Sequence, residues 1–119
     1  ELDNPASMLR IDCAAILNDN GFMDFAYQTL LPIHDIALED TDFKSEWVFC
    51  LLAAHKFEHP DLKPILTFFL QNIENDPYYA FCLGAYRCLK GDEGAGEQMT
   101  SILKDYPEFL ERAAHLGIA

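Results

Sequence analysis

The sequence predicts an all-α fold of seven helices, arranged as three helix hairpins and a C-terminal capping helix. Along most of the 119 residues, apolar residues recur three and four positions apart, which is the spacing of one helical face. Capping residues, prolines and glycines divide these stripes into segments of helix length. No alternating run of apolar and polar residues is bounded by hairpin turn residues, so we expect no strands.

The first helix is expected to begin after Asn4, with Pro5 at its first position, and to end at Asn20 and Gly21. An asparagine caps a helix through its side-chain oxygen, and a proline lacks only an amide hydrogen that the first turn does not use. The stripe expected to face inward comprises Met8, Ile11, Ala14, Ala15 and Leu17.

The second helix is expected to cover about residues 22–37, with a kink at Pro32, because proline removes a hydrogen bond from the helical ladder. An acidic linker, residues 39–42, follows and ends in residues that can cap a third helix. The inward residues expected on the second helix are Phe25, Ala26, Leu30 and Ile33.

The third helix, about residues 43–56, and the fourth, about residues 60–74, are rich in apolar residues. Because the fourth is apolar nearly all round, we expect it to be the most buried helix of the chain. Pro64 falls early in it and is expected to bend or tighten its first turn.

The stretch from Asp76 to Pro107 carries the clearest hairpin signal. Asp76 and Pro77 can start a helix, Gly91 can end it, and Pro107 stops a second helix. Two amphipathic helices cannot bury both of their apolar faces alone, so the hairpin needs stacked neighbours. A last helix, about residues 107–115, is expected to cover the open face of this hairpin.

This stretch, DPYYAFCLGAYRCLKGDEGAGEQMTSILKDYP, resembles the tetratricopeptide repeat (TPR), a helix–turn–helix unit of 34 residues. With Asp76 as the first position, Tyr86 falls at position 11, Ala95 at 20 and Pro107 at 32, while Leu83 stands at position 8, which is usually small. The resemblance implies one domain, residues 1–119, built as a TPR-like right-handed helical repeat; a generic helical bundle is the alternative. The units are expected at about residues 7–42, 43–75 and 76–107, with a cap at 107–117.

Composition limits the partners. The 20 acidic residues outnumber the 8 basic ones, for a net charge of −12, which disfavours nucleic acid and anionic membrane surfaces as partners. No apolar run approaches the ~18 residues of a membrane span, and no signal peptide is recognisable, so we expect no membrane insertion.

Four cysteines without a CxxC pair indicate buried, reduced thiols and a cytoplasmic location. They are Cys13, Cys50, Cys82 and Cys88.

Signatures of catalysis are missing, and we expect neither an enzyme nor a cofactor. GxSxG, GxxxxGK, HExxH and GxGxxG do not occur. The acidic, glycine-rich segment 91–96 is expected to be a turn. His55 and His59 are four residues apart, but Pro60 interrupts the helix on which they would share a metal, so no metal site is expected.

The resemblance also implies a concave groove, lined by positions 5, 9 and 12 in the first helix of each hairpin. The residues at these positions are mostly apolar, which suits an apolar helix or extended segment of a partner. Trp47 is the expected anchor. The alternative is that Trp47 and Leu51 fill the core between hairpins. The groove residues are Ile11, Ala15, Asn18, Trp47, Leu51, Ala54, Ala80, Gly84 and Arg87.

The favoured function is a protein-binding helical-repeat domain, a cytoplasmic chaperone or adaptor that sequesters an apolar segment of its partner. Small acidic helical arrays of this kind are similar to the TPR chaperones of bacterial type III secretion, which implies a secretion-system subunit as the partner. An unpaired apolar groove also favours a homodimer when no partner is bound. The second hypothesis is a scaffold or assembly domain excised from a larger protein, since the chain starts at Glu1. The third is a small all-α enzyme or metal protein.

Overall fold

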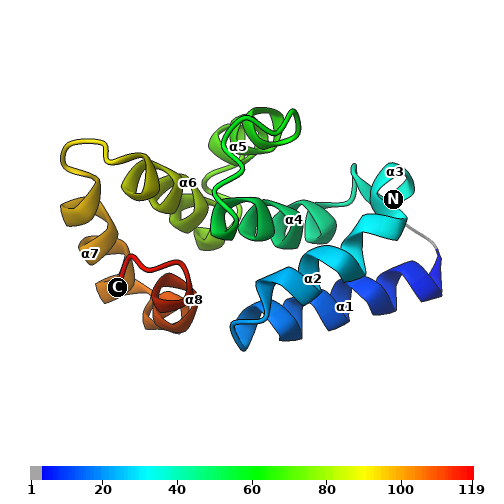
Figure 1. Cartoon of the computed structure of the whole chain (residues 1–119). Coiled ribbons are helices and arrows are strands. Elements are labelled where there is room, and N and C mark those ends of the chain that lie inside the picture. The colour runs from blue at the N-terminus through cyan, green and yellow to red at the C-terminus, as the bar shows by residue number, and fades with distance from the viewer. Residues whose placement is uncertain (1–3) are drawn as a thin grey trace.

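Residues 4–119, which the computed structural model describes, fold into helices joined by short turns and contain no strand (Figure 1). The predicted all-α class is confirmed for these residues; residues 1–3 of the predicted domain lie outside them. The elements are α1 (Pro5–Asp19), α2 (Met23–Leu30), η1 (Leu31–Ile33), α3 (His34–Ala37), α4 (Thr41–Ala53), α5 (Leu62–Gln71), α6 (Pro77–Lys90), α7 (Ala95–Asp105), η2 (Pro107–Phe109) and α8 (Leu110–His115).

Two of the predicted N-caps form. The Asn4 side chain accepts the amide hydrogen of Ala6 at 2.9 Å, and the Asp76 carboxylate accepts that of Tyr78 at 2.9 Å. Gly91 follows α6 with φ of 77°, a left-handed conformation that costs glycine little because it has no Cβ. The helices α1 and α6 therefore begin and end close to where their capping residues predict.

The kink predicted at Pro32 is confirmed. A 3₁₀ turn, Leu31–Ile33, separates α2 from α3. Proline has no amide hydrogen to donate to the ladder, so the chain passes through a tighter turn before the helix resumes.

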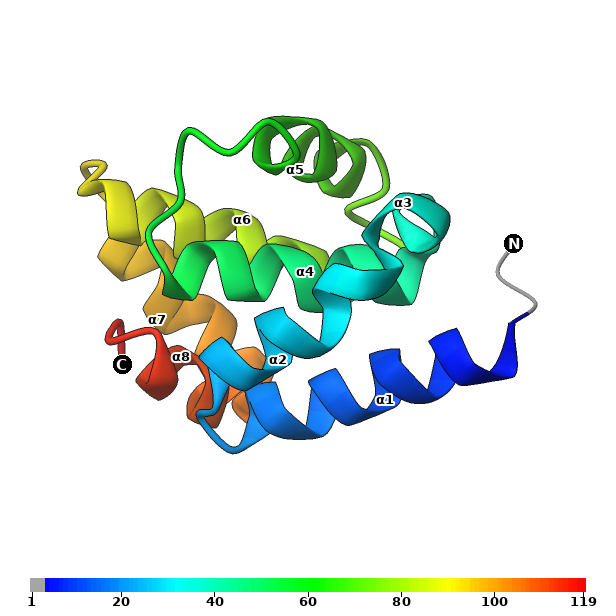
Figure 2. The same ribbon diagram turned by 45° about the vertical axis from the view of Figure 1, so that its right-hand side comes forward.

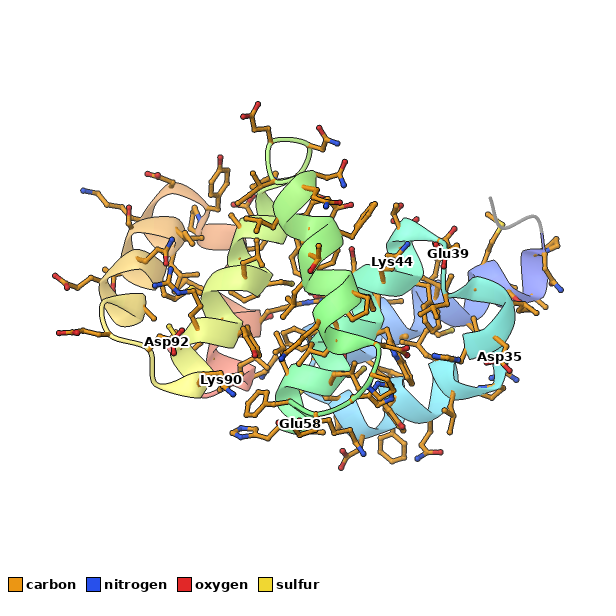
Figure 3. All side chains as sticks on the ribbon, turned by 90° about the horizontal axis from the view of Figure 1, so that it is seen from above. Asp35, Glu39, Lys44, Glu58, Lys90 and Asp92 are labelled. Carbon is orange, nitrogen blue, oxygen red and sulfur yellow. The ribbon has the colours of Figure 1, made fainter. Side chains whose placement is uncertain are left out.

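Helix α4 begins earlier than predicted, because a residue inside the acidic linker caps it. Asp40, rather than Asp42, is the capping residue, and its carboxylate accepts the amide hydrogens of Asp42 at 2.9 Å and of Phe43 at 3.0 Å. The helix consequently begins at Thr41, two residues before the predicted start at residue 43. Beside this cap, Lys44 lies 3.5 Å from a carboxylate oxygen of Glu39, and both are labelled in Figure 3.

The helix at the centre of the molecule is α4, which packs against α1, α2, α5 and α6 (Figures 1 and 2). Six consecutive residues, 47–52, are buried, as expected for a helix with neighbours on every side. The prediction that the helix of residues 60–74 is the most buried is wrong. Leu70 of α5 is 61% exposed, because α5 lies at the edge of the fold and packs mainly on α4 and α6.

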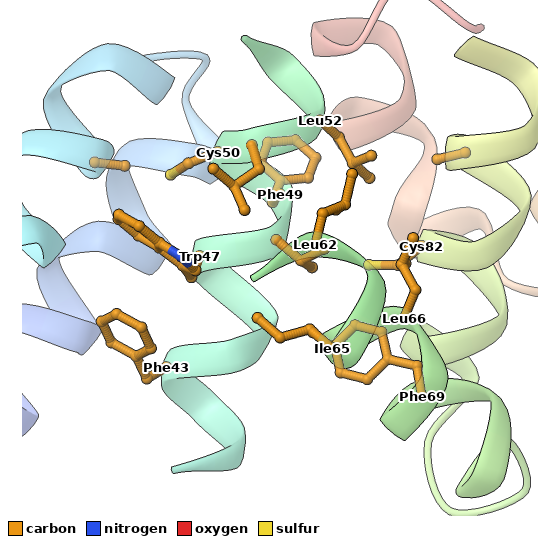
Figure 4. Packing of buried hydrophobic residues seen from close by; sticks show 14 of the residues in the cluster. Phe43, Trp47, Phe49, Cys50, Leu52, Leu62, Ile65, Leu66, Phe69 and Cys82 are labelled. Atoms are coloured by element: carbon orange, nitrogen blue, oxygen red, sulfur yellow. The ribbon is translucent and has the colours of Figure 1, made fainter. Parts of the chain in front are cut away.

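The core is a single cluster of buried side chains that spans the layers on both sides of α4. Figure 4 shows Phe49 and Leu52 of α4 close to Leu62 of α5, with Cys82 of α6 beyond them. All four side chains are buried, so the second and third hairpins share one continuous apolar interior.

The last helix covers α6, as predicted, and also reaches α1. The Phe109 ring lies 5.1 Å from the ring of Phe81 and 5.7 Å from that of Tyr78, both on α6. From α8, the Arg112 Nε donates a hydrogen bond to Asp19 at the end of α1 at 2.8 Å. The C-terminal helix thus joins the third hairpin to the first.

Candidate functional site

The nine residues predicted to line a groove do not form one open surface. Five are buried, two are half-buried and two are exposed. Arg112 of α8 also lies across the face that α1, α4 and α6 share. The buried residues are Ile11, Asn18, Trp47, Leu51 and Gly84, the half-buried ones Ala15 and Ala80, and the exposed ones Ala54 and Arg87.

Trp47 is a core side chain, with 1% of its surface exposed. Its ring stacks on Tyr27 of α2, with centroids 4.9 Å apart, and on Phe43, at 5.4 Å. Figure 4 shows Trp47 among the buried side chains. Its Nε1 donates a hydrogen bond to Asp61 at 3.0 Å, so its polar atom is satisfied as well. The expectation that Trp47 anchors a partner at the surface is therefore wrong for this structure, and the alternative, that it fills the core, describes what is observed.

Gly84 faces the partner helix of its own hairpin rather than an open groove. A Cβ added there would lie 3.0 Å from the terminal methyl of Met99 and 3.3 Å from that of Ile102, both on α7. The absence of a side chain allows α6 and α7 to approach closely. The small residue that the repeat pattern places at residue 83 thus lies one position later, and Gly84 serves hairpin packing.

Arg112 fills part of the face shared by α1, α4 and α6. Its guanidinium donates to the Tyr78 hydroxyl at 2.9 Å and to the Ala15 carbonyl at 3.1 Å, and it pairs with Glu46 at 3.0 Å. Burial lowers the pKa of Arg112, but the neighbouring Tyr78, Glu46 and Asp19 outweigh burial and raise it above its usual value. Arg112 thus links α8 to α1, α4 and α6, and its removal would leave the partly buried Glu46 without its counter-charge.

Beside Arg112 a cleft of about 300 Å³ remains open. Its lining is predominantly acidic. Burial raises the pKa of Asp42 in this cleft, and repulsion from Asp40, Asp12 and Asp76 raises it further. The cleft therefore disfavours phosphate and other anions. The lining residues are Asp19, Asp42, Ser45, Glu46, Asp76, Tyr78, Glu108, Phe109 and Arg112.

A second pocket, of about 410 Å³, brings His34, His59 and Asp61 together. The His34 Nε2 lies 2.6 Å from Asp61, and its Nδ1 lies 2.8 Å from Asp35. The His59 Nδ1 accepts the backbone amide hydrogen of Asp61 at 3.1 Å. These contacts tie η1 and α3 to the start of α5.

The histidines considered for a metal lie outside α4. This helix ends at Ala53, and His55 follows in a turn with φ of 55°. His59 instead packs edge-on against Trp47 at 5.9 Å. Among residues 4–119, no three His, Cys, Asp or Glu side chains are placed to hold a metal ion.

The cysteines are unpaired in the part of the chain that is described, and their surroundings differ. Burial raises the pKa of the Cys50 thiol to about 12 and also raises the pKa of Cys82, which disfavours the reactive thiolate at both positions. Cys13, predicted to lie on a buried helical face, is exposed.

Large apolar side chains are exposed on the first hairpin. Leu9, Cys13 and Ile16 are spaced four and three residues apart, so they share one face of α1, opposite the buried face that carries Ile11 and Ala14. Ile16 is 63% exposed. The helical spacing of this second stripe is present in the sequence, but Cys13 is predicted there to lie on a buried face, and Leu9 and Ile16 carry no prediction.

The exposed residues of α2 lie beside this stripe. The two helices run antiparallel (Figures 1 and 2), and at the turn between them the amide of Phe22 donates to the Leu17 carbonyl at 2.8 Å. Tyr27 stacks on Trp47, and Phe25 is two residues away, about 200° around the helix, on the flank that lies along α1. Phe25, predicted to face inward, is 64% exposed, and its ring lies 6.4 Å from that of Phe22. We call these residues the first-hairpin face: Leu9, Cys13, Ile16, Phe22 and Phe25.

Comparison with known proteins adds no relative: no family model, curated protein or solved structure matches the chain. None of the helices formed by residues 4–119 combines the length and apolar character that crossing a membrane requires.

Proposed function

We propose that the chain is a protein-binding helical domain, a chaperone or adaptor that holds an apolar segment of a partner protein. The packing order supports a TPR-like arrangement as part of this proposal. The first helices of the hairpins, α1, α4 and α6, pack on one another in succession, and each also packs on the second helix of its own hairpin.

The observation that carries the proposal is the distribution of exposed apolar side chains. Of the eleven large ones exposed in residues 4–119, seven lie in the first hairpin and the segment after it. Contiguous exposed apolar surface on a folded domain marks protein interaction sites. The seven are Met8, Leu9, Ile16, Phe22, Phe25, Leu31 and Ile36.

The interior supports the same choice of surface. Trp47 and Leu51 are committed to the core, so they contribute nothing to a contact unless the fold opens. The first-hairpin face needs no rearrangement, and burying one of its large side chains contributes about 1.5–3 kcal/mol to docking before the costs of association. A partner helix laid along α1 would contact Leu9 and Ile16, which lie about two turns apart on the same face.

The proposal is tested by titrating the protein into fluorescently labelled amphipathic helical peptides of about 18 residues, or five turns, and recording anisotropy. Peptides with the same leucine face and a lysine, glutamine or glutamate polar face form the panel. We expect at least one to bind, and Ile16→Asp to weaken that binding by about tenfold or more. Leu70→Asp is the matched control, because Leu70 is 61% exposed on α5, away from α1. Equal loss in both variants, or no binding by any peptide, contradicts the proposal.

A further inference from the structure

The first hairpin is acidic. Residues 8–36 contain four acidic residues, Asp12, Asp19, Asp24 and Asp35, against one basic residue, Arg10. The Arg10 guanidinium donates to the backbone carbonyl of Thr29 at 3.2 Å, so it lies along the seam between α1 and α2. The apolar surface thus lies in a field of negative charge.

One of these carboxylates belongs to the apolar stripe itself. Asp12 lies three residues after Leu9 and four before Ile16, so it shares their side of α1, and all three are exposed. On α2, Asp24 is exposed but lies beside Tyr27 and Cys50, on the flank that faces α4 rather than α1. A docked segment would therefore meet the Asp12 carboxylate among apolar groups.

The charge extends beyond the hairpin into the cleft beside Arg112. Asp12 lies close enough to Asp42 for the two carboxylates to repel each other. Asp42, Asp76 and Glu108 also line that cleft. A positive group brought to this side of α1 would relieve repulsion that the free protein carries.

A second copy of the chain is the wrong occupant for such a surface. Each copy carries a net charge of −12, and pairing two first-hairpin faces would bring two sets of carboxylates together. Like charges placed opposite each other across an interface cost several kcal/mol. Charge complementarity instead favours a partner with positive charge.

From these contacts we infer that the first-hairpin face docks a cationic amphipathic helix of another protein. The apolar side of that helix covers Leu9, Ile16 and Phe25, and a lysine or arginine side chain pairs with Asp12. This inference rests on the proposed function and specifies the chemistry of the partner.

The same peptide panel tests the inference, with dissociation constants measured at about 50 mM and about 500 mM salt. We expect the lysine peptide to bind about tenfold more tightly than the glutamine peptide, and the glutamate peptide to bind least. High salt is expected to remove most of the difference in affinity between the lysine peptide and the glutamine peptide. Asp12→Asn should reduce the lysine peptide's advantage to about threefold or less without affecting the glutamine peptide.

The control for the charge change is Glu93→Gln. Glu93 is exposed at the α6–α7 turn, so the net charge changes equally at a remote place. This variant should keep the lysine peptide's advantage. Loss of the advantage in both variants would mean that total charge, not this face, selects the peptide, and would overturn the inference.

Further outcomes separate the inference from the proposed function. If the glutamine and lysine peptides bind equally and Ile16→Asp weakens both, the inference fails while protein binding stands. If no peptide binds, both fail. If light scattering shows a dimer that Ile16→Asp converts to monomer, a second copy covers the face, and the cationic partner is overturned.

Discussion

The Arg112 Nε of α8 donates a hydrogen bond to the Asp19 carboxylate of α1 at 2.8 Å, although the two residues are 93 positions apart in the chain. The same guanidinium contacts Glu46 on α4 and Tyr78 on α6. One side chain therefore ties together the first helices of all three hairpins. An array that the repeat pattern predicts to leave an open concave face is partly covered by its own last helix.

Replacing Arg112 by Met is expected to lower the free energy of unfolding by about 3 kcal/mol, measured by urea denaturation. The loss arises because the Glu46 side chain, only 13% exposed, is left as an uncompensated partly buried charge. Arg87→Met is the control. Arg87 is exposed, pairs with Asp92 at 3.7 Å and donates to exposed Gln98 at 2.6 Å, so its loss should cost less than about 1 kcal/mol. Equal effects from the two substitutions would show that the Arg112 contacts do not hold the fold.

Stability is expected to depend on pH through His34 and Asp61. The hydrogen bond to Asp35, together with that to Asp61, outweighs burial and raises the pKa of His34 above 6.5. Burial alone would raise the pKa of Asp61, but hydrogen bonds from His34 and Trp47 lower it below 3.8. The His34 contribution is complete below pH 6.5 and is lost as the pH rises through the raised pKa. The Asp61 contribution is present above pH 3.8 and is lost as the pH falls through the lowered pKa.

These signs predict that the melting temperature falls as the pH rises from about 5 to 8, and that His34→Gln removes much of this slope. The comparison with His34→Gln cancels contributions from groups that both proteins share. A wild-type slope that persists unchanged in the variant would assign the pH dependence to other groups.

Thiol reagents should distinguish the cysteines. Cys13 is exposed and is expected to react first with iodoacetamide, followed by half-buried Cys88. Cys50 and Cys82 are buried and their pKa values are raised, so they should react only when the chain unfolds. Peptide mapping by mass spectrometry after timed labelling measures the order. Labelling of Cys50 as fast as Cys13 in native buffer would contradict the packing of α4.

Two glycines on adjacent helices should respond oppositely to the same substitution. Gly84→Ala is expected to lower the free energy of unfolding by about 1 kcal/mol. The new methyl group would crowd Met99 and Ile102, and the cost of this contact exceeds the stability that alanine gains from its higher helix propensity. Gly96→Ala meets no atom within 4 Å and should raise stability by about 0.5 kcal/mol. Denaturant titration of both variants measures this contrast, and the same sign for both would mean that α6 and α7 do not approach closely.

Some helix boundaries were predictable because their causes are local, whereas α4 ends about three residues earlier than predicted and α5 is shorter at both ends. Asn4, Asp76, Gly91 and Pro32 each act on neighbouring backbone groups, and each does what its chemistry predicts. The start of α4 was missed by two residues because Asp40 and Asp42 are equally good capping residues, and the choice between them depends on packing.

Burial was less predictable. The helical spacing of Trp47 and Leu51 fits an exposed apolar face as well as a core face. Only the packing of α2 and α5 around α4 decides that this face is buried. The contact between Arg112 and Asp19 spans 93 residues and has no local signal. The stripe of Leu9, Cys13 and Ile16 has a local signal, a second apolar face on a helix that already has one, but the prediction that Cys13 is buried missed it.

The most direct test of the central claim is to locate the bound peptide on the protein by chemical-shift perturbation of ¹⁵N-labelled wild type titrated with the lysine-faced helix. We expect the largest shifts at Cys13, Ile16 and Phe25, on the first-hairpin face. Largest shifts at Ala54, Ala80 and Arg87, with little change on α1 and α2, would contradict the claim and place the partner in the groove that the repeat pattern predicts.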